Sequence, residues 1–285
     1  MNSSEENFDS MMSHQLEPVV YNLKTLHALV SFLNGRQCSI HFEFETGMNR
    51  LGFNEIELST AIQLLRENSN IKIKSVFSHL SGADEREHDE FSKSQFAQFQ
   101  KMFSTLSSEL KINPIKHILN SAGILRFADF QMDMVRLGIG LYGVDPTEEK
   151  NNQLQIAATL KTVISQLKKI KPGETIGYGR HGKAKQEMTI ATLAIGYADG
   201  FSRGFSKGVG KVLVNGKKAP VIGNVCMDMT MIDVTGVDVN EGDEVVIFGE
   251  DLSIHEVAGS IGTIPYEILT NTSERVKRVF VSEGI

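Results

Sequence analysis

The sequence predicts two fold classes in one chain, an incomplete (β/α)8 barrel of the TIM type followed by a C-terminal antiparallel β-domain. Up to about residue 146, short apolar runs alternate with amphipathic stretches, which indicates βα units. After the polar stretch at 147–153, short strands are separated by glycine turns, as in antiparallel sheets. We therefore place a first domain, the partial barrel, at 1–146 and a second, the β-domain, at 147–285.

The first domain is predicted to contain five strands and three clear helices. The strands are expected at 18–21, 38–45, 73–79, 115–119 and 134–138, and the helices at 23–33, 56–66 and 90–106. Glu45, His79 and Asn120 stand at the carboxyl ends of three strands, where the catalytic rim of a barrel lies. A closed barrel needs eight strands, so roughly three βα units are expected to be missing.

The second domain is predicted to be built from short strands and one helix. The strands are expected at 156–170, 188–195, 211–214, 219–234 and 244–248. Asn215-Gly216 is the dipeptide favoured in two-residue hairpins and predicts a tight turn. Ser253 followed by Glu256 predicts a capping box at the start of a helix over 254–261, and Gly262 should end that helix.

Composition excludes several classes of function. The chain has 285 residues, of which 41% are hydrophobic, and its net charge of −6 argues against a nucleic-acid-binding surface. No stretch approaches the roughly 20 apolar residues that span a membrane, and the polar start is unlike a signal peptide, so we expect a cytoplasmic protein. Cys38 and Cys226 have no metal-ligand spacing, so no metal site is expected.

The segment from Thr189 to Asp233 contains the clearest candidates for functional residues. A β-rich run delivers Tyr197 next to Gly196 and before Asp199-Gly200, and glycines there let the backbone turn tightly near a ligand. Cys226-Met227-Asp228 follows in a run of alternating apolar residues. Each feature alone is usually explained by packing, and only their combination points to a site.

In combination, GYADGFSR and KAPVIGNVCMDMTMIDV closely resemble the C-terminal β-domain of bacterial alanine racemases. Further matches cover nearly the whole chain: HFEFETGMNRLGF (41–53), SHLSGADE (78–85), HILNSAGILRF (117–127), MVRLGIGLYGVDP (134–146), TIGYGR (175–180) and GTIPYEILTNTSERVKR (262–278). The resemblance implies a fold type III enzyme that uses pyridoxal 5'-phosphate to interconvert L-alanine and D-alanine for peptidoglycan precursors. It also implies a homodimer whose active sites are shared between subunits.

The resemblance assigns catalytic roles to three residues. Tyr197 matches the tyrosine that one subunit contributes to the other, where it serves the L-alanine face. His79 and Arg136 match residues between this tyrosine and the cofactor, and Arg136 matches the arginine that hydrogen-bonds the pyridine nitrogen. No lysine here lies in the motif of the family's Schiff-base lysine, which belongs to the N-terminal part of the barrel. The chain is therefore expected to be inactive without that part.

The resemblance also implies the groups that hold the cofactor phosphate. Asn120 and Ser121 open a turn, and Gly138 and Ile139 offer backbone N–H groups; such groups bind anions at loop-to-helix starts. Tyr266 matches the family tyrosine that reaches the same phosphate. Three separate motifs thus agree on one phosphate site.

The substrate groups are implied in the same way, with one departure from the family. Arg50 matches the arginine that touches the substrate carboxylate, Met227 matches a residue whose backbone lies near it, and Tyr178 matches a residue at the entrance. Where many members carry a lysine that is often carbamylated, this chain has Glu43. A carbamylated lysine is an anion, so Glu43 could supply the negative charge directly and support Arg50. Glu45 lies on the same face of the predicted strand as Glu43, so its substitution can be compared with that of Glu43.

Other functions remain open on the sequence. A relative of the same fold could racemise or decarboxylate another amino acid, such as serine, lysine or arginine, and the shape of the pocket would decide. A non-catalytic remnant that dimerises through its β-domain is the alternative from a different class. An open sheet with exposed edges would make such a remnant prone to aggregation.

Overall fold

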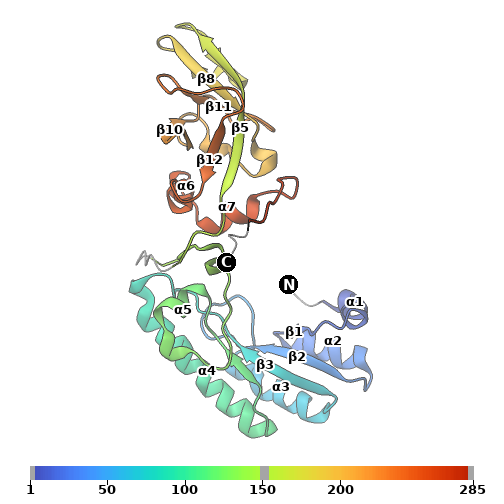
Figure 1. Cartoon of the computed structure of the whole chain (residues 1–285). Coiled ribbons are helices and arrows are strands. Elements are labelled where there is room, and N and C mark those ends of the chain that lie inside the picture. The colour runs from blue at the N-terminus through green and yellow to red at the C-terminus, as the bar shows by residue number, and fades with distance from the viewer. Residues whose placement is uncertain (1–3, 148–153, 282–285) are drawn as a thin grey trace. The chain divides into compact units, whose positions relative to one another are not determined.

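The computed structural model describes residues 4–147 and 154–281 and divides into two compact units. The first unit holds Met1–Leu141 with Asp145–Leu154, and the second holds Tyr142–Val144 with Gln155–Ile285. Figure 1 shows the course of the chain through both. The predicted boundary at residue 146 falls in the segment where the chain changes unit.

The first unit is built on a four-stranded parallel sheet in the order β1-β2-β3-β4. Its strands are β1 (Val19–Val20), β2 (Cys38–Glu43), β3 (Ile71–Phe77) and β4 (Ile115–His117). Three helices lie along one face of this sheet in Figure 1: α2 (Leu23–Leu33), α3 (Glu55–Glu67) and α4 (Asp89–Leu110). The predicted partial barrel is therefore confirmed as an open α/β layer.

The helices begin and end where their side chains satisfy the free backbone groups. The side chain of Asn22 accepts a hydrogen bond from the N–H of Thr25, and α2 ends at Asn34 in a left-handed conformation. α3 begins with a capping box formed by Asn54 and Glu57. The predicted bounds of α2 are correct, and those of α3 differ by one residue at each end.

The core lies between the sheet and these helices. Ile40, Phe42 and Val76 point toward the helices and are fully buried, and the ring of Phe42 stacks on that of Phe53 with centroids 4.3 Å apart. Because successive side chains on a strand point to opposite faces, the intervening residues lie on the face away from the helices. These include His41 and Ser75, so polar groups gather on that face.

The fifth predicted strand, at 134–138, is wrong. The segment runs beside β4, because the N–H of Arg136 donates to the carbonyl of Leu119 (3.0 Å) and that of Met134 donates to Lys116 (3.3 Å). It forms no regular ladder and leads at Ile139–Tyr142 into a 3-10 turn. The sequence did not predict α1 (Phe8–Ser13) or α5 (Ser121–Arg126) either.

The second unit contains a six-stranded sheet in the order β10-β9-β12-β5-β8-β11. Its antiparallel pairing confirms the predicted class of this domain, for which five strands were expected. Its strands are β5 (Leu160–Ile170), β8 (Met188–Leu193), β9 (Lys211–Val214), β10 (Lys217–Pro220), β11 (Thr230–Asp233) and β12 (Glu244–Phe248). A small hairpin of β6 (Thr175–Ile176) and β7 (Gly182–Lys183) and the helices α6 (Ile254–Ser260) and α7 (Pro265–Asn271) complete it.

Two local predictions in the second unit are corrected. The single strand predicted at 219–234 is two strands, because the chain turns at Gly223, whose φ is +70°, and pairs again only from Thr230. The capping box at Ser253 is also wrong: its hydroxyl accepts from the N–H of His255, while Glu256 forms an ion pair with Lys218.

The predicted hairpin turn is confirmed. Asn215 and Gly216 have φ of +46° and +74°, the left-handed pair that a type I′ turn requires between β9 and β10.

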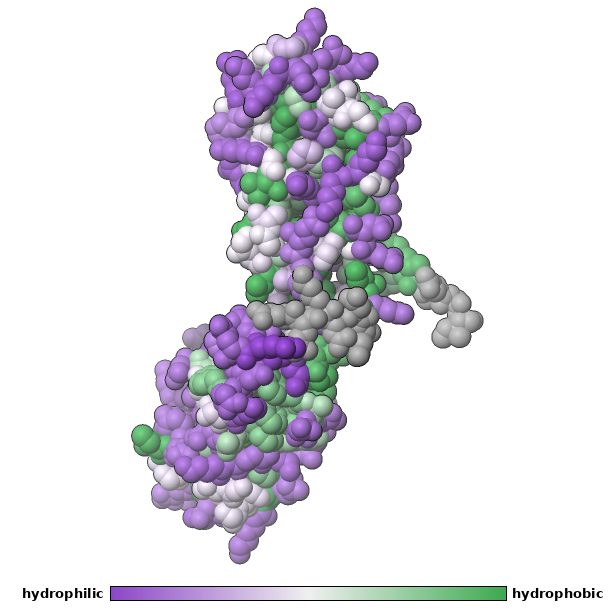
Figure 2. Space-filling view, turned by 90° about the vertical axis from the view of Figure 1, so that its left-hand side faces the viewer, coloured by the Kyte–Doolittle hydropathy of each residue, from purple (hydrophilic) through white to green (hydrophobic). Residues whose placement is uncertain are grey.

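The surface is mixed in polarity. Figure 2 shows polar side chains on both units with apolar ones among them on the face it draws. Large apolar side chains that are exposed on the second unit include Tyr178 (74%), Met227 (53%) and Met229 (54%). In the described part of the chain, no helix is both long and apolar enough to cross a membrane.

Candidate functional site

Arg136 is the centre of a polar cluster in the first unit. Its Nη1 donates to Nδ1 of His117 (2.5 Å), and its Nη2 donates to the carbonyls of Ser78 (2.8 Å) and Ile118 (3.2 Å). The same Nη2 lies 3.3 Å from Nδ1 of His79. Among the described residues no acceptor faces the Nε–H of Arg136. This donor therefore has no partner within the described part of the chain.

The protonation state of His79 follows from its surroundings. Burial, followed by the positive charges of Arg136 and Arg50, lowers the pKa of His79 to about 4. The ring is neutral at pH 7. Because Arg136 can only donate, Nδ1 of His79 accepts and its hydrogen is on Nε2. His79 can therefore donate one hydrogen bond from Nε2 to a ligand.

The loop that carries His79 is held by a buried glutamine of α4. Nε2 of Gln95 donates to the carbonyl of His79 (3.0 Å), and its Oε1 accepts from the N–H of Ser81 (3.0 Å). Gln95 is fully buried, so these bonds are not exchanged with water. This role was not predicted, because a glutamine on the buried face of a helix has no distinctive local pattern.

Glu43 and Glu45 act on Arg50 in different ways. Burial raises the pKa of Glu43, whose side chain is 6% exposed, while the charges of Arg50 and Arg136 oppose this rise. No ion pair joins Glu43 to Arg50 among the described residues. The carboxylate of Glu45 instead accepts from the backbone N–H groups of Gly47 and Arg50 and shapes their loop. Support of Arg50 by Glu43 stays a prediction, and only its charge favours it.

The predicted phosphate residues come together at the start of α5. The side chain of Asn120 caps this helix by accepting from the N–H of Gly123 (2.9 Å). The hydroxyl oxygen of Ser121 accepts from the N–H groups of Gly138 (2.9 Å) and Gly140 (3.3 Å), and Ile139 between them is buried. Both N–H groups are thus paired with the serine oxygen, and such a cluster of a hydroxyl and backbone N–H groups is of the kind that binds phosphate.

The shifted pKa values of His79 and Glu43 predict opposite effects of acid on the stability of the first unit. The lowered pKa of His79 contributes stability above pH 6.5 that is lost as the pH falls toward 4, on the order of 2 kcal/mol after allowance for its partial exposure. The raised pKa of Glu43 contributes stability only below its folded pKa, so acid favours folding there. We expect His79→Gln to flatten the fall in unfolding free energy between pH 7 and 4, and Glu43→Gln to steepen it.

Urea titrations at several pH values, followed by amide exchange in β2 and β3, measure this difference. The same slope in both variants would contradict the assignment.

Three predicted site residues of the second unit lie around one hollow. Tyr178, Tyr197 and Met227 line it together with Arg203 and Asn224, and its volume is about 460 Å³. All three are exposed, Tyr197 by 42%. Tyr266 lies apart from this hollow, on α7.

The turn that presents Tyr197 is interlocked with the loop that presents Met227. The N–H of Tyr197 donates to the carbonyl of Cys226 and that of Ala198 to the carbonyl of Met227, each at 3.0 Å. A Cβ on Gly196 would lie 2.4 Å from both of these carbonyl oxygens. Only glycine fits there, because the two backbones touch.

Arg275 fastens the same two loops from outside. Its Nε donates to Oδ1 of Asp199 (2.7 Å) and its Nη2 to Oδ1 of Asp228 (2.6 Å). The other oxygen of Asp199 accepts from the N–H of Gly196 (2.8 Å). Sequence reasoning missed Arg275, although it stands in the matched segment 262–278.

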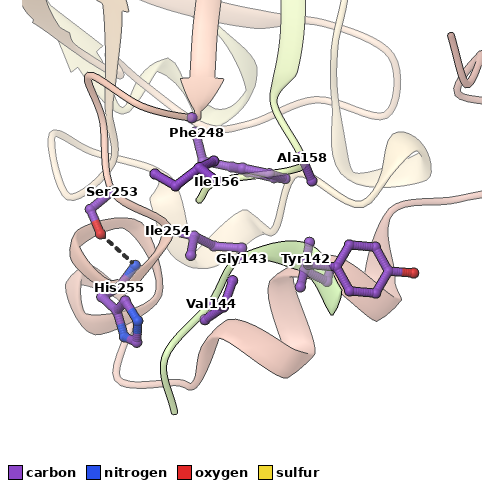
Figure 3. Close-up of a pocket in the computed structure, with 11 residues that line it drawn as sticks. Tyr142, Gly143, Val144, Ile156, Ala158, Phe248, Ser253, Ile254 and His255 are labelled. Atoms are coloured by element: carbon purple, nitrogen blue, oxygen red, sulfur yellow. Dashed lines mark hydrogen bonds between the residues drawn. The ribbon is translucent and has the colours of Figure 1, made fainter. Parts of the chain in front are cut away.

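A separate small cavity of the second unit holds none of the predicted site residues. It has a volume of about 50 Å³ and apolar walls that include Val144, Ile156 and Phe248. Figure 3 shows one hydrogen bond beside it, between Ser253 and His255. The cavity is far smaller than an amino acid or a cofactor, so it is not a substrate site.

Comparison with known families identifies the fold. The model of the alanine racemase N-terminal domain matches residues 2–146, and that of the alanine racemase C-terminal domain matches residues 157–280. The chain belongs to the alanine racemase family. The members of this family are pyridoxal phosphate-dependent isomerases.

Individual alanine racemases are similar to this chain in sequence and in structure. Alanine racemase 1 of Clostridium acetobutylicum is 40% identical over 288 residues, which cover 97% of this chain and 74% of that protein. The crystal structure of alanine racemase from Bacillus anthracis with bound L-Ala-P has a TM-score of 0.91 at 32% identity and covers 99% of this chain and 75% of that one. The crystal structure of alanine racemase from Bartonella henselae with covalently bound pyridoxal phosphate has a TM-score of 0.87 at 29% identity. The match covers 98% of this chain and 77% of that one.

Proposed function

We propose that this chain forms the greater part of an enzyme that interconverts L-alanine and D-alanine with pyridoxal phosphate. The observation that carries the proposal is the Arg136 cluster: a buried guanidinium with a free Nε–H, beside a neutral histidine. A set of phosphate donors at Ser121 belongs to the same unit.

The residues of the first unit fit this cofactor in two places. The Nε–H of Arg136 would donate to the pyridine nitrogen. The hydroxyl of Ser121 would donate to the phosphate, and the N–H groups of Gly138 and Gly140 would exchange their bonds to the serine oxygen for bonds to the phosphate. Asn120, Ile139 and Tyr266 remain predicted phosphate contacts. When bound, the cofactor supplies an electron sink for the Cα of the amino acid. Arginine keeps its proton and so makes this sink weaker than a carboxylic acid partner would.

The covalent attachment is assigned to a lysine outside this chain. In the described part of the first unit, no lysine forms a hydrogen bond or ion pair with Arg136, His79 or Ser121. Lys74 pairs with Glu17, and Lys116 lies over the ring of Phe103 and 3.8 Å from Asp133. These lysines are engaged elsewhere.

A labelling experiment tests this assignment. After incubation with pyridoxal phosphate and reduction with borohydride, we expect peptide mapping to show the same weak labelling of surface lysines in the chain and in Arg136→Met. A single lysine labelled to completion in the chain, and not in Arg136→Met, would place the attachment site within the sequence.

Three residues around the hollow and three of the first unit are assigned to the substrate. Tyr197 would take the proton from the Cα of L-alanine and return one to that face, while Met227 and Tyr178 limit the size of the side chain. Arg50 would bind the carboxylate, and Glu43 would support it through its charge. His79, with its hydrogen on Nε2, would hold the oxygen of the tyrosine that the second copy contributes.

A homodimer is part of the proposal. The hollow is surrounded by exposed apolar side chains, including Tyr178, Met227 and Met229. Exposed apolar groups gathered around a site are typical of surfaces that a second chain covers. This supports an active site shared between two copies.

The decisive test restores the missing lysine. The chain would be joined to the part of Clostridium acetobutylicum alanine racemase 1 that it does not span, and net racemisation of both alanine enantiomers would be measured. We expect activity in the joined protein and none in the chain alone. Activity on serine, lysine or arginine but not on alanine would favour the relative with another substrate, and cofactor binding without any racemisation would favour the non-catalytic remnant.

A further inference from the structure

A continuous line of hydrogen bonds crosses the sheet of the first unit from its surface to Arg136. It joins the carboxylate of Glu17 to Nε2 of His41 (3.1 Å) and Nδ1 of His41 to the hydroxyl of Ser75 (2.6 Å). From Ser75 it continues to Nε2 of His117 (3.2 Å), and from Nδ1 of His117 to Nη1 of Arg136 (2.5 Å). We call Glu17, His41, Ser75 and His117 the polar relay.

Strand register places the polar relay. His41 on β2 is paired in register with Ser75 on β3, and both lie on the face away from the helices. His117 on β4 is paired with Phe77, two residues beyond Ser75, so its ring reaches the serine diagonally and stacks on Phe77. Ser75 is 1% exposed and His117 is 5% exposed. The middle of the relay is therefore shielded from water.

The polar relay connects Arg136 to a carboxylate, which its direct contacts do not include. Arg136 is a partly buried cation, and charges removed from water normally have a partner of opposite charge. Among the described residues, no carboxylate forms an ion pair with Arg136. Its contacts are two carbonyls and two neutral histidines. Glu43 acts on Arg136 through its charge without a hydrogen bond, and the carboxylate that hydrogen bonds connect to Arg136 is that of Glu17.

When the rings of His41 and His117 are both neutral, the hydrogens of the relay run in one direction. Arginine only donates, so Nδ1 of His117 accepts and its hydrogen is on Nε2, which donates to Ser75. The serine hydroxyl then gives its hydrogen to Nδ1 of His41. That leaves the hydrogen of His41 on Nε2, where it points at Glu17. Every bond is oriented from the cation to the anion, and bonds aligned in this way strengthen one another.

We propose that Glu17 is the remote counter-charge of Arg136, and that the polar relay positions the arginine by holding its Nη1 edge so that the Nε–H stays free. No proton leaves the relay, whose bonds transmit polarisation only. The effect of this positioning on the pyridine nitrogen of the cofactor rests on the proposed function. The hydrogen bonds of the relay are present without the cofactor.

The charges at both ends agree with this arrangement. A hydrogen bond from Lys74 lowers the pKa of Glu17, so this carboxyl is ionised at pH 7. Burial, followed by the charge of Arg136, lowers the pKa of His117 to about 4, so its ring is neutral and able to accept.

Nuclear magnetic resonance of the chain with ¹⁵N-labelled histidine and arginine tests the proposal. We expect both His41 and His117 to carry their hydrogen on Nε2, and a scalar coupling across the hydrogen bond between Arg136 and His117. Glu17→Gln should shift the Nε2–H signal of His117, about two side chains away, and the Arg136 Nη signal with it. Either ring with its hydrogen on Nδ1, or an unchanged His117 and Arg136 in Glu17→Gln, would overturn the relay.

A double-mutant cycle separates transmission from a general disturbance. In Ser75→Ala the line is cut, so adding Glu17→Gln should no longer shift His117 or Arg136. Ser78→Ala is the matched control, because Ser78 is also buried in this unit but its hydroxyl bonds to Thr46, outside the relay. Adding Glu17→Gln to Ser78→Ala should shift His117 as in the parent. Equal shifts in both backgrounds would show that Glu17 acts through space and not through Ser75. No cofactor or activity enters this test, so it stands apart from the racemase proposal.

Discussion

Tyr197→Phe is expected to reduce deuterium exchange at the Cα of L-alanine by about 10² to 10⁴-fold in the joined protein, the usual contribution of a general base. Exchange from D-alanine should be affected far less, because the lysine serves the opposite face. The physical reason is local. Tyr197 is the proposed base of the hollow, and phenylalanine keeps its ring and its packing but has no hydroxyl.

Tyr178→Phe provides the matched control for this experiment. It removes a hydroxyl from the same hollow, at a residue assigned to the entrance. Exchange from each enantiomer would be followed separately by mass spectrometry in deuterium oxide. If both enantiomers slow equally in Tyr197→Phe, or if Tyr178→Phe behaves in the same way, then Tyr197 is not the base for one face.

Arg136→Met is expected to lower the unfolding free energy of the first unit by about 2 to 4 kcal/mol. Methionine preserves much of the apolar stem, but the carbonyls of Ser78 and Ile118 and Nδ1 of His117 lose their donor. Each buried group left unsatisfied costs about 1 to 3 kcal/mol, and the relief of burying a cation offsets part of the sum.

Urea unfolding of the chain, read from amide exchange in β2 and β3, measures this loss. Arg50→Met is the control, because Arg50 is exposed and its side chain forms no hydrogen bond among the described residues. Its effect should stay within about 0.5 kcal/mol. Equal effects of the two substitutions would mean that the Arg136 cluster contributes no stability.

Much of the fold could be predicted because local signals and packing agree. α2 has an apolar stripe, a capping asparagine and a left-handed C-cap, and its predicted ends are those observed. The segment 134–138 has the apolar pattern of a strand as well, but a strand also needs a partner, and pairing is not visible in a local pattern. The long strand predicted at 219–234 failed for the same reason, since Gly223 turns the chain within an apolar run.

The site could be predicted only where motifs resemble a known family. Residues that act through others gave no local signal. Ser75 lies 34 residues from His41 and 42 from His117, and Arg275 lies 76 residues from Asp199. Such contacts depend on strand register and on loops that meet in space, and both are properties of the folded chain. His117 stood in a quoted motif without an assigned role for this reason.

The contact of Gly196 with the carbonyls of Cys226 and Met227 limits how this protein can acquire a new substrate. The loop of Met227 is the natural place to enlarge the space for a bulkier side chain. Because the turn of Tyr197 is hydrogen-bonded to that loop, any shift of one displaces the other. Substitutions in this loop that make room for larger amino acids should therefore also lower turnover. A second substitution in the 196–200 turn would be needed to restore the position of the Tyr197 hydroxyl.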